Sequence, residues 1–352
     1  MAPRELVVIG WDIGGVNTKA VRLHWQDGNV LSQRAATRPF EIWREKKRLL
    51  AVLQEIAAEL VAEEAEAMAV TMTAELSDVF RSKREGVLFV FDQLSTAFPH
   101  VPVYALALDG AFVPLDVARL RPLDFAAANW LAGALFVARQ HPDCILVDVG
   151  STTTDVIPIR NGQATTEGRT DLSRLAAGEL VYTGVLRTNP NAIVSQVPVQ
   201  GRMCRVSAEY FAVMGDVSLL LGYLPAASYT IPTPDGREKT PQRAHERLAR
   251  LVCADGEMLS REQVLELARY LHEKQLQQIS DAVLQVLSRL EGDYRPPLAV
   301  AGAGHFLASE VGHRLGLPVI DLEKEWGSEV AAVIPCLAAA YLLAGHLDAE
   351  GR

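Results

Sequence analysis

The chain has 352 residues, of which 49% are hydrophobic and 22% charged, and its formal net charge is −9 at pH 7. This length suits two lobes and the composition is that of a soluble globular protein, while the evenly spread negative charge disfavours nucleic acid and anionic membranes as partners. Four widely spaced cysteines, and no run of about 20 apolar residues, argue against a zinc site, a disulfide framework and a membrane span.

The N-terminal region predicts a hairpin followed by a strand, a helix and another strand. Residues 6–12 are apolar and β-branched up to a Gly-Gly turn, and Asp27-Gly28 supplies a second hairpin turn. Leucines and isoleucines at helical spacing predict a helix over residues 42–64. The expected strands are 6–12, 18–25, 30–37 and 67–72, an order typical of a mixed sheet covered by helices. Further helices are expected at 89–98 and 125–139, with a strand at 101–106 between them.

The opening pattern returns near the middle of the chain, where an apolar strand again ends in Asp-x-Gly and a polar turn. Aligning Asp12 with Asp148 matches the pattern D-[IV]-G-[GS]-x-x-T at a single offset of 136 positions. The aligned pairs are Asp12 and Asp148, Gly14 and Gly150, Gly15 and Ser151, and Thr18 and Thr154. An internal repeat of this kind predicts two related lobes, each with one strand-turn-strand hairpin.

The C-terminal half is less regular. Residues 187–202 and 229–242 are rich in prolines and polar residues, and such long loops are often binding elements or lids. An amphipathic helix, or a pair of helices, is expected over 261–290. A buried strand at 298–301 runs into Gly302-Ala303-Gly304. The remaining expected elements are a helix at 306–315, a strand at 319–321 and an apolar helix at 330–343.

Both repeated turns have the composition of a phosphate-binding hairpin. Glycines let the backbone turn tightly so that its amides point at an anion, and hydroxyl, amide and ammonium side chains add donors. The expected phosphate-binding residues are Gly14, Gly15, Asn17, Thr18 and Lys19 in the first turn, and Gly150, Ser151, Thr152, Thr153 and Thr154 in the second. One such turn is equally consistent with a plain hairpin. Two with the same pattern favour a ligand shared between them across one cleft.

An aspartate precedes each glycine turn. A carboxylate does not favour a phosphate, but its oxygens are the ligands that Mg²⁺ prefers. We therefore expect Asp12 and Asp148 to hold Mg²⁺, directly or through water, and to be catalytic for that reason. Gly302 and Gly304 are expected on the ligand side of the next helix start, and close packing of helix and strand is the alternative interpretation.

Two phosphate hairpins and a late glycine turn together resemble the actin/hexokinase/Hsp70-like (ribonuclease H-like) fold. That fold is α/β and two-lobed, with duplicated mixed sheets, flanking helices and a central cleft. We expect one lobe at residues 1–128 with the closing helix in 329–352, and the other at residues 129–328. Within this fold the chain resembles the hydantoinase A/oxoprolinase family, on the motifs DIGGVNTK, TMTAEL, LVDVGSTTTDV, YTGV and AGAG. The stretches DIGGVNTKAV, ANWLAGA and VSAEYFAVMGDVSLLLG resemble one branch of it, the condensing enzymes of methanofuran biosynthesis in tetrahydromethanopterin-linked C1 metabolism.

The resemblance implies a transferase that joins an (aminomethyl)furanylmethyl diphosphate to the phenol of γ-glutamyltyramine and releases diphosphate. The hairpins would then hold the substrate's own diphosphate with Mg²⁺, and ATP is not expected. A base must take the phenol proton, although each candidate carboxylate taken alone is more typical of a solvated or structural group. The candidates are Glu75, Asp78, Glu209 and Asp216, of which Glu75 and Asp216 are the expected catalytic residues. Arg187 is a further candidate, for neutralising the substrate.

Two other classes of function stay open. One is an ATP-dependent enzyme of the same fold, either a small-molecule kinase or a lactam-opening hydantoinase/oxoprolinase, and the other is a nucleotide-regulated binding module. Histidine metal motifs, the G-x-S-x-G elbow and the Walker sequence are missing from the chain. The N-terminal apolar run is too short for a signal peptide, so we expect a cytoplasmic protein. Its expected partners are small-molecule substrates, not nucleic acid or membrane, and a homodimer is left open.

Overall fold

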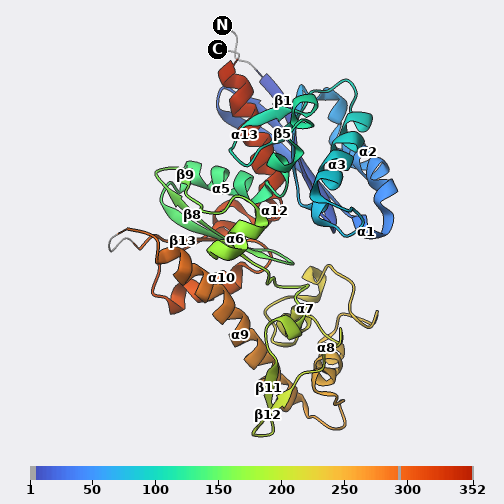
Figure 1. Ribbon diagram of the computed structural model, residues 1–352, viewed down its shortest axis with the longest axis vertical. Coiled ribbons are helices and arrows are strands. Elements are labelled where there is room, and N and C mark those ends of the chain that lie inside the picture. The colour runs from blue at the N-terminus through green and yellow to red at the C-terminus, as the bar shows by residue number, and fades with distance from the viewer. Residues whose placement is uncertain (1–4, 292–294, 351–352) are drawn as a thin grey trace. The chain divides into compact units, whose positions relative to one another are not determined.

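The computed structural model describes residues 5–291 and 295–350. The chain divides into two compact units (Figure 1). Unit 1 comprises the described residues up to Pro142, residues 160–164 and those from Ser328 onward, and unit 2 comprises residues 143–159 and 165–327. Each unit has its own hydrophobic core, because the two clusters of buried apolar side chains share no residue.

Unit 1 is built on a six-stranded mixed sheet with the order β3-β2-β1-β4-β5-β6. Its strands are β1 (Glu5–Ile13), β2 (Asn17–Gln26), β3 (Asn29–Pro39), β4 (Ala67–Met72), β5 (Val103–Leu106) and β6 (Phe112–Pro114). The first three strands pair antiparallel, β1, β4 and β5 run parallel, and β6 returns antiparallel. The last six residues of β1 are all buried, as expected for a central strand covered on both faces.

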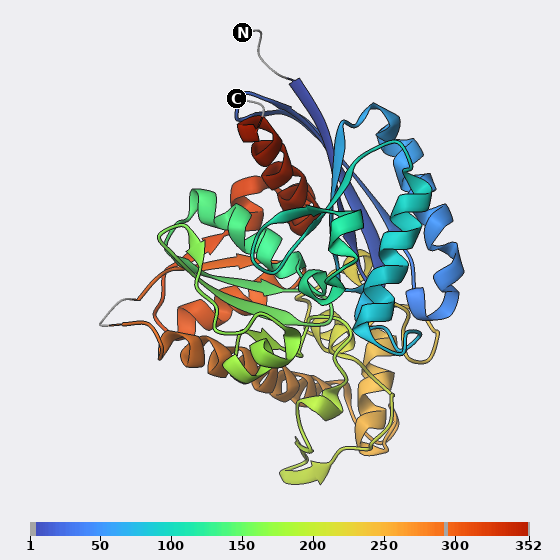
Figure 2. The same cartoon turned by 45° about the horizontal axis from the view of Figure 1, so that its top comes forward.

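Helices cover both faces of this sheet. α2 (Leu49–Leu60) and α3 (Lys83–Ala97) lie on one face and α13 (Ile334–Glu350) on the other, as Figures 1 and 2 show. α13 approaches β1 closely because Gly10 has no side chain: a β-carbon there would lie 2.7 Å from the Ala340 amide nitrogen. The remaining elements of unit 1 are α1 (Ile42–Glu45), α4 (Leu115–Ala118), α5 (Asn129–Gln140), β9 (Gln163–Ala164) and α12 (Ser328–Ala331).

α5 belongs to unit 1, whereas the expected boundary after residue 128 places it in the second lobe. Its Phe136 ring meets Tyr341 of α13 edge-on, with 5.1 Å between ring centroids. A β-carbon at Gly133 would be 3.5 Å from the Ile334 side chain, so this face of α5 fits against α13. The boundary therefore depends on a contact with a helix much later in the chain, for which there is no local signal.

Unit 2 contains a second mixed sheet, with the main path β10-β8-β7-β13-β14. Its strands are β7 (Cys144–Val149), β8 (Thr154–Arg160), β10 (Leu180–Val181), β13 (Leu298–Ala301) and β14 (Val319–Asp321). β7, β8 and β10 pair antiparallel, whereas β7, β13 and β14 run parallel.

The two sheets follow the same path. When the strands of each path are numbered in chain order, the unit 1 path reads 3-2-1-4-5-6 and the unit 2 path reads 3-2-1-4-5. In both, the first three strands pair antiparallel, and strands 1, 4 and 5 run parallel. This duplication, with helices on the sheets, confirms the expected α/β fold of the actin/hexokinase/Hsp70-like (ribonuclease H-like) class.

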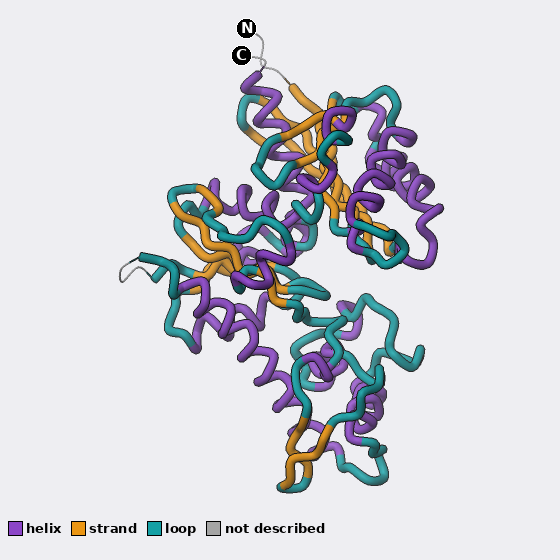
Figure 3. The backbone as a smooth tube through the Cα atoms, in the orientation of Figure 1, coloured by secondary structure: helices purple, strands orange, loops and turns teal. Residues whose placement is uncertain are grey.

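A largely irregular segment, residues 187–260, follows the first strands of unit 2; we call it the insert. Figure 3 shows it as loops around short helices. The continuous helix α9 (Arg261–Leu287) contacts the insert at one end and β10 at the other. The hairpin β11–β12 lies in the insert, partly within residues 187–202, which are expected to be loop. The other elements of unit 2 are α6 (Asp171–Ala177), β11 (Gln196–Val199), β12 (Arg202–Arg205), α7 (Met214–Leu220), α8 (Pro241–Ala249), α10 (His305–Arg314) and α11 (Leu322–Trp326).

Helix boundaries differ from the expected ones where caps intervene. The helix expected over 42–64 is split. α2 ends at Leu60, and the following residue, Val61, caps it in a left-handed conformation (φ 53°) while its amide donates to the Ala57 and Ala58 carbonyl oxygens. α3 begins several residues before the expected start, because Ser82 accepts a hydrogen bond from the Glu85 amide at 3.2 Å. None of the helices in the described part of the chain is long and apolar enough to cross a bilayer.

Candidate functional site

The two predicted turns close with the same backbone hydrogen bond. The Gly14 amide donates to the Asn17 carbonyl oxygen at 2.9 Å, and the Gly150 amide donates to the Thr153 carbonyl oxygen, also at 2.9 Å. The strand pairs that flank the turns are equivalent too: Ile13 with Thr18, and Val149 with Thr154. The sequence repeat is therefore a repeat of structure. The Gly14 and Gly150 amides, expected to bind phosphate, instead close the turns.

Other backbone groups of the turns are oriented by the segments that follow. The Gly15 carbonyl oxygen accepts from the Ile42 amide at 3.1 Å, and the Ser151 carbonyl oxygen accepts from the Arg187 amide at 2.8 Å. In a trans peptide the C=O and N–H groups point in opposite directions. The amides of Val16 and Thr152 therefore point away from the groups that hold those carbonyls. Each turn can offer such an amide to an anion.

Thr18 and Thr154 do not fit their expected role in binding phosphate. Both residues have 0% exposure. The Thr154 hydroxyl donates to the Thr183 carbonyl oxygen at 2.7 Å. Side chains alternate along a strand, so Thr18 lies on the opposite face of its hairpin from Lys19. Both threonine side chains point into the interior of their unit, a distinction that the pattern D-[IV]-G-[GS]-x-x-T does not make.

Asp12 is a buried carboxylate at the end of β1. The residue is 9% exposed, and within the described residues its Oδ1 atom has no hydrogen-bond partner. Burial raises the pKa of the Asp12 carboxyl from 3.8 to about 6, and the charge of Lys19 opposes that rise. The Lys19 ammonium donates to the Ala332 carbonyl oxygen at 2.8 Å. A desolvated carboxylate oxygen is what a hard cation would satisfy, so Asp12 fits Mg²⁺.

Asp148, the equivalent residue of unit 2, lies against the glycine turn after β13. The Gly304 amide donates to the Val149 carbonyl oxygen at 2.8 Å. A β-carbon at Gly302 would overlap the Asp148 Oδ1 atom, and one at Gly304 would lie 2.5 Å from the Val149 side chain. The turn is therefore adjacent to the second hairpin. Close packing, the alternative interpretation, explains why both positions are glycine.

The carboxylates do not form a metal site made of protein ligands alone. Among the described residues, no three His, Cys, Asp or Glu side chains are grouped so that they could hold a metal ion. Mg²⁺ usually keeps water and phosphate ligands and takes only one or two carboxylates from the protein. One aspartate beside each hairpin therefore suits Mg²⁺ bound with a phosphate, and does not suit a structural zinc.

Residues 183–187 brace the second hairpin. The Val185 amide donates to the Gly150 carbonyl oxygen at 3.0 Å, and a β-carbon at Gly184 would lie 2.5 Å from the Thr152 amide nitrogen. The buried side chain of Gln275, on α9, donates to the Thr183 hydroxyl at 3.0 Å and to the Gly184 carbonyl oxygen at 2.9 Å. Gln275 is not among the expected residues, and its only signal is a polar residue within the apolar stripe of an amphipathic helix. The Arg187 amide donates to the Ser151 carbonyl oxygen, so the backbone of Arg187 lies next to this turn.

Glu75 lies at the same end of the unit 1 sheet as the first hairpin. β4 runs parallel to β1, and the Thr73 amide donates to the Ile13 carbonyl oxygen at 3.0 Å. Glu75 follows in a 3-10 turn (Ala74–Leu76) and is 1% exposed. The Lys83 ammonium lies 3.9 Å from its Oε1 atom. The structure thus brings a buried carboxylate of unit 1 to the end of the sheet where Asp12 lies.

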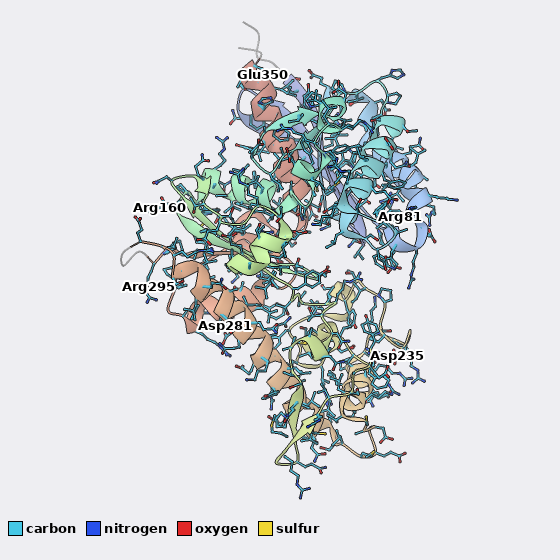
Figure 4. The ribbon with its side chains drawn as sticks, in the orientation of Figure 1. Arg81, Arg160, Asp235, Asp281, Arg295 and Glu350 are labelled. Carbon is cyan, nitrogen blue, oxygen red and sulfur yellow. The ribbon has the colours of Figure 1, made fainter. Side chains whose placement is uncertain are left out.

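Asp216 is held inside the insert. Its Oδ1 atom lies 2.7 Å from Arg247 Nη2 and 2.8 Å from Nε, and the Tyr229 hydroxyl donates to it at 3.2 Å. Asp216 and Arg247 both have 0% exposure. Arg247 also pairs at 3.1 Å with Asp235, which is labelled in Figure 4. These contacts satisfy the carboxylate internally, so its geometry is structural and does not support the expected role as a base. Asp78 and Glu209 are exposed.

Comparison with known proteins identifies the family. A family model described as hydantoinase/oxoprolinase matches residues 66–344. The chain belongs to this hydantoinase/oxoprolinase family. Within the family's sequence motifs, residues 71–76 lie at the edge beside the first hairpin, residues 182–185 brace the second, and Gly302 contacts Asp148. In each unit the motifs therefore gather around the hairpin of that unit.

Two similar proteins share one name. The (4-{4-[2-(gamma-L-glutamylamino)ethyl]phenoxymethyl}furan-2-yl)methanamine synthase of Methanocaldococcus jannaschii is 33% identical over 345 residues, covering 98% of this chain and 99% of that protein. The protein of the same name from Methanococcus vannielii is 30% identical over 223 residues, covering 62% of this chain and 98% of that protein. Among solved structures, nucleotide-free acetone carboxylase matches with a TM-score of 0.57 at 12% identity, covering 96% of this chain and 70% of that one. This last likeness shows the fold of this hydantoinase/oxoprolinase family member and nothing of its chemistry.

Proposed function

We propose that this protein is a transferase of methanofuran biosynthesis. It condenses an (aminomethyl)furanylmethyl diphosphate with γ-glutamyltyramine and releases diphosphate. The observation that carries the proposal is the 33% identity, over nearly the whole length of both chains, to a synthase whose name describes a phenoxymethyl-furan amine. The compound in that name contains an aryl ether bond, which is the bond that such a condensation forms.

The reaction breaks one C–O bond and makes another. The bond between the furanylmethyl carbon and the diphosphate oxygen breaks, and its electron pair leaves with the diphosphate. The phenol oxygen then bonds to that carbon and loses its proton. Because the furan ring stabilises positive charge on the attached carbon, the main catalytic requirement is to stabilise the departing anion.

The chain offers several groups for that task. The amides of Val16 and Thr152 are oriented by the bonds that hold the neighbouring carbonyls, so they need no reorganisation to meet phosphate oxygens. The hydroxyls of Ser151 and Thr152, 3.4 Å apart, lie in the second turn and add donors. The backbone of Arg187 lies next to that turn, and its side chain adds positive charge. Ser151, Thr152 and Arg187 are partly exposed, unlike Thr18 and Thr154.

Asp12 and Asp148 are the residues that would hold Mg²⁺, directly or through water. When bound with the diphosphate, the ion supplies charge stabilisation worth several kcal/mol. We assign the proton-accepting role to Glu75. Among the candidate carboxylates, it is the one that is buried and also lies at the end of the sheet where a phosphate hairpin lies. ATP has no role in this reaction.

The assay combines the protein with Mg²⁺, the furanylmethyl diphosphate and γ-glutamyltyramine, and follows diphosphate release together with the mass of the coupled product. A reaction without γ-glutamyltyramine controls for simple hydrolysis. Equal amounts of diphosphate and ether, with no need for ATP, are expected. Absence of the ether, together with ADP formation from ATP and another acceptor, would assign the protein to the kinases of this fold instead.

A further inference from the structure

The peptide group between Ser151 and Thr152 is held in place by residues 183–188, which we call the bracing segment. The Ser151 carbonyl oxygen accepts hydrogen bonds from the amides of Leu186, at 3.1 Å, and Arg187, at 2.8 Å. The Thr152 N–H belongs to the same peptide group and points the opposite way from that oxygen. Two bonds to one oxygen therefore fix the direction of the amide that would meet a phosphate oxygen.

Gly184 of the bracing segment lies directly against the same peptide group. A β-carbon at Gly184 would lie 2.5 Å from the Thr152 amide nitrogen and 2.6 Å from the Ser151 carbonyl carbon. Gly184 is itself fixed by side chains, since its amide donates to the Thr188 hydroxyl oxygen at 2.8 Å and its carbonyl oxygen accepts from Gln275 Nε2 at 2.9 Å. A shift of Gly184 would therefore shift the turn.

Gln275 is a polar residue on the buried face of α9. It is 0% exposed, as are Leu271 and Ile279, which lie one turn before and after it. Its Nε2 atom faces the Gly184 carbonyl oxygen, which can only accept, so the orientation of the side-chain amide is determined. The Oε1 atom is then left without a hydrogen-bond partner among the described residues, which costs stability. The Gly184 carbonyl oxygen also accepts from the Thr188 hydroxyl at 3.2 Å, so stability alone gives little reason for a glutamine here.

We propose that Gln275 is a positioning residue for the reaction: it fixes Gly184 and, through Gly184, the direction of the Thr152 amide that binds the diphosphate. The inference rests on the proposed function, because it takes the second hairpin to hold the diphosphate of the substrate. Thr188 serves the same purpose from within the bracing segment. Donors that are already oriented need no reorganisation when charge develops on the leaving group. Loss of the Gln275 amide should therefore lower kcat more than it raises the KM.

The test uses variants of both side chains that hold Gly184. Gln275→Met keeps nearly the same size but cannot donate a hydrogen bond. Thr188→Val removes the hydroxyl, and Thr188→Ser keeps it. The matched control is Gln285→Met on the same helix, because the Gln285 side-chain amide also donates to a backbone carbonyl oxygen, that of Ala176 at 3.0 Å, outside the bracing segment.

Each variant is measured in ways that separate positioning from stability. Calorimetry gives the affinity for inorganic diphosphate with Mg²⁺, which does not depend on the reaction. Kinetics of the condensation give kcat per folded molecule and the KM for the furanylmethyl diphosphate, and thermal unfolding gives the Tm. Hydrogen exchange of the Val185, Leu186 and Arg187 amides reports on the bracing segment, because these amides donate to the turn.

We expect Gln275→Met to change the Tm little and to lower kcat about ten- to a hundredfold, with a smaller change in the KM. Its affinity for inorganic diphosphate should fall about three- to tenfold. The amides of the bracing segment should exchange faster. Thr188→Val should change in the same direction, Thr188→Ser should recover most of that loss, and Gln285→Met should behave as the wild type.

The outcomes distinguish this inference from the proposed function. If Gln275→Met matches Gln285→Met in kcat per folded molecule and in diphosphate affinity, Gln275 is only structural and the inference is overturned, while the proposed function stands. If the wild type forms no ether but Gln275→Met still binds diphosphate more weakly, the positioning role is supported and the proposed reaction is wrong. A wild type that does not bind diphosphate with Mg²⁺ would overturn both.

Discussion

Gly302 and Asp148 are in direct contact, and the contact leaves no room for a side chain. A β-carbon at position 302 would overlap the Asp148 Oδ1 atom and lie 2.7 Å from the Val149 carbonyl carbon. Gly302 also has a φ of +83°, which favours glycine by itself. The orientation of one proposed Mg²⁺ carboxylate therefore depends on a glycine far away in the sequence.

Gly302→Ala should damage both stability and catalysis. The left-handed backbone alone costs roughly 1–2 kcal/mol for a residue with a β-carbon, and displacing Asp148 should lower kcat at least about tenfold. The matched control is Gly316→Ala, because Gly316 has a φ of +66° but nothing within 4 Å of its β-position. Unfolding and kinetics of the two variants separate backbone strain from contact. Equal kcat values in both would show that the contact with Asp148 does not matter for turnover.

Asp12→Asn and Asp148→Asn should each reduce turnover at least about a hundredfold with the fold intact, because a departing diphosphate needs several kcal/mol of charge stabilisation. The measurement is kcat as a function of Mg²⁺ concentration. Asp78→Asn, at an exposed position, is the control and should behave as the wild type. Near-normal turnover in either variant removes that aspartate from the mechanism.

The raised pKa of Asp12 predicts a pH-dependent stability with a definite sign. Its carboxyl titrates at about 6 in the folded protein against 3.8 in a free carboxyl, so the folded state holds more protons between these values. The contribution of Asp12 to the free energy of unfolding is therefore fully present below pH 3.8. It is lost, by at most about 3 kcal/mol, as the pH rises through about 6. In EDTA, the Tm advantage of Asp12→Asn over the wild type should be small at pH 4 and grow towards pH 7. Mg²⁺ should narrow it, and an advantage that does not change with pH would contradict the assignment.

Glu75→Gln tests the base. Loss of a general base costs about 10²- to 10⁴-fold in rate, but a phenol with a pKa of about 10 ionises unaided at high pH. The kcat of the variant should therefore approach that of the wild type as the pH rises, with little change in the KM for the diphosphate. The exposed Glu63→Gln serves as control. A rate lowered equally at every pH would mean that Glu75 is only structural.

Asp216→Ala should lower the stability of the insert strongly and change kcat per folded molecule little. Removing one partner of a buried ion pair leaves Arg247 buried and uncompensated, at a cost of about 3–5 kcal/mol. The double variant Asp216→Leu/Arg247→Met removes both charges and should recover much of that loss. Denaturant unfolding measures the stability, and kcat per folded molecule tests the chemistry. A large fall in kcat at unchanged stability would return Asp216 to the catalytic residues.

The repeated hairpins could be predicted because their signal is local. Asp12 and Asp148 mark the strand ends, and glycines mark turns whose hydrogen bonds proved equivalent. The face on which each side chain lies was harder to predict. Thr18 and Thr154 match the pattern as well as any residue, but strand alternation buries both, and that depends on register.

Sequence patterns did not predict which residues far apart in the chain contact each other. A buried partner for Asp216 was expected on physical grounds, but Arg247 sits across an irregular loop from it and nothing in the spacing connects the two. The ring contacts of Tyr223 with His272 and Phe306 have the same origin, since a loop residue and two helix residues far apart in the sequence come together only through tertiary packing. Residues that act through tertiary contacts leave no periodic trace in the sequence.

The position of α13 on β1 has a consequence for synthesis of the protein. The face of β1 that carries Gly10 is covered by residues of α13, which leave the ribosome long after β1 has emerged. All residues of unit 2 emerge before α13 does. Unit 2 can therefore complete its core on the nascent chain, while one face of the unit 1 sheet stays uncovered until residues 334–350 are made. During that interval the apolar face of β1 that α13 later covers stays exposed, and chaperone binding to nascent chains is expected to concentrate there.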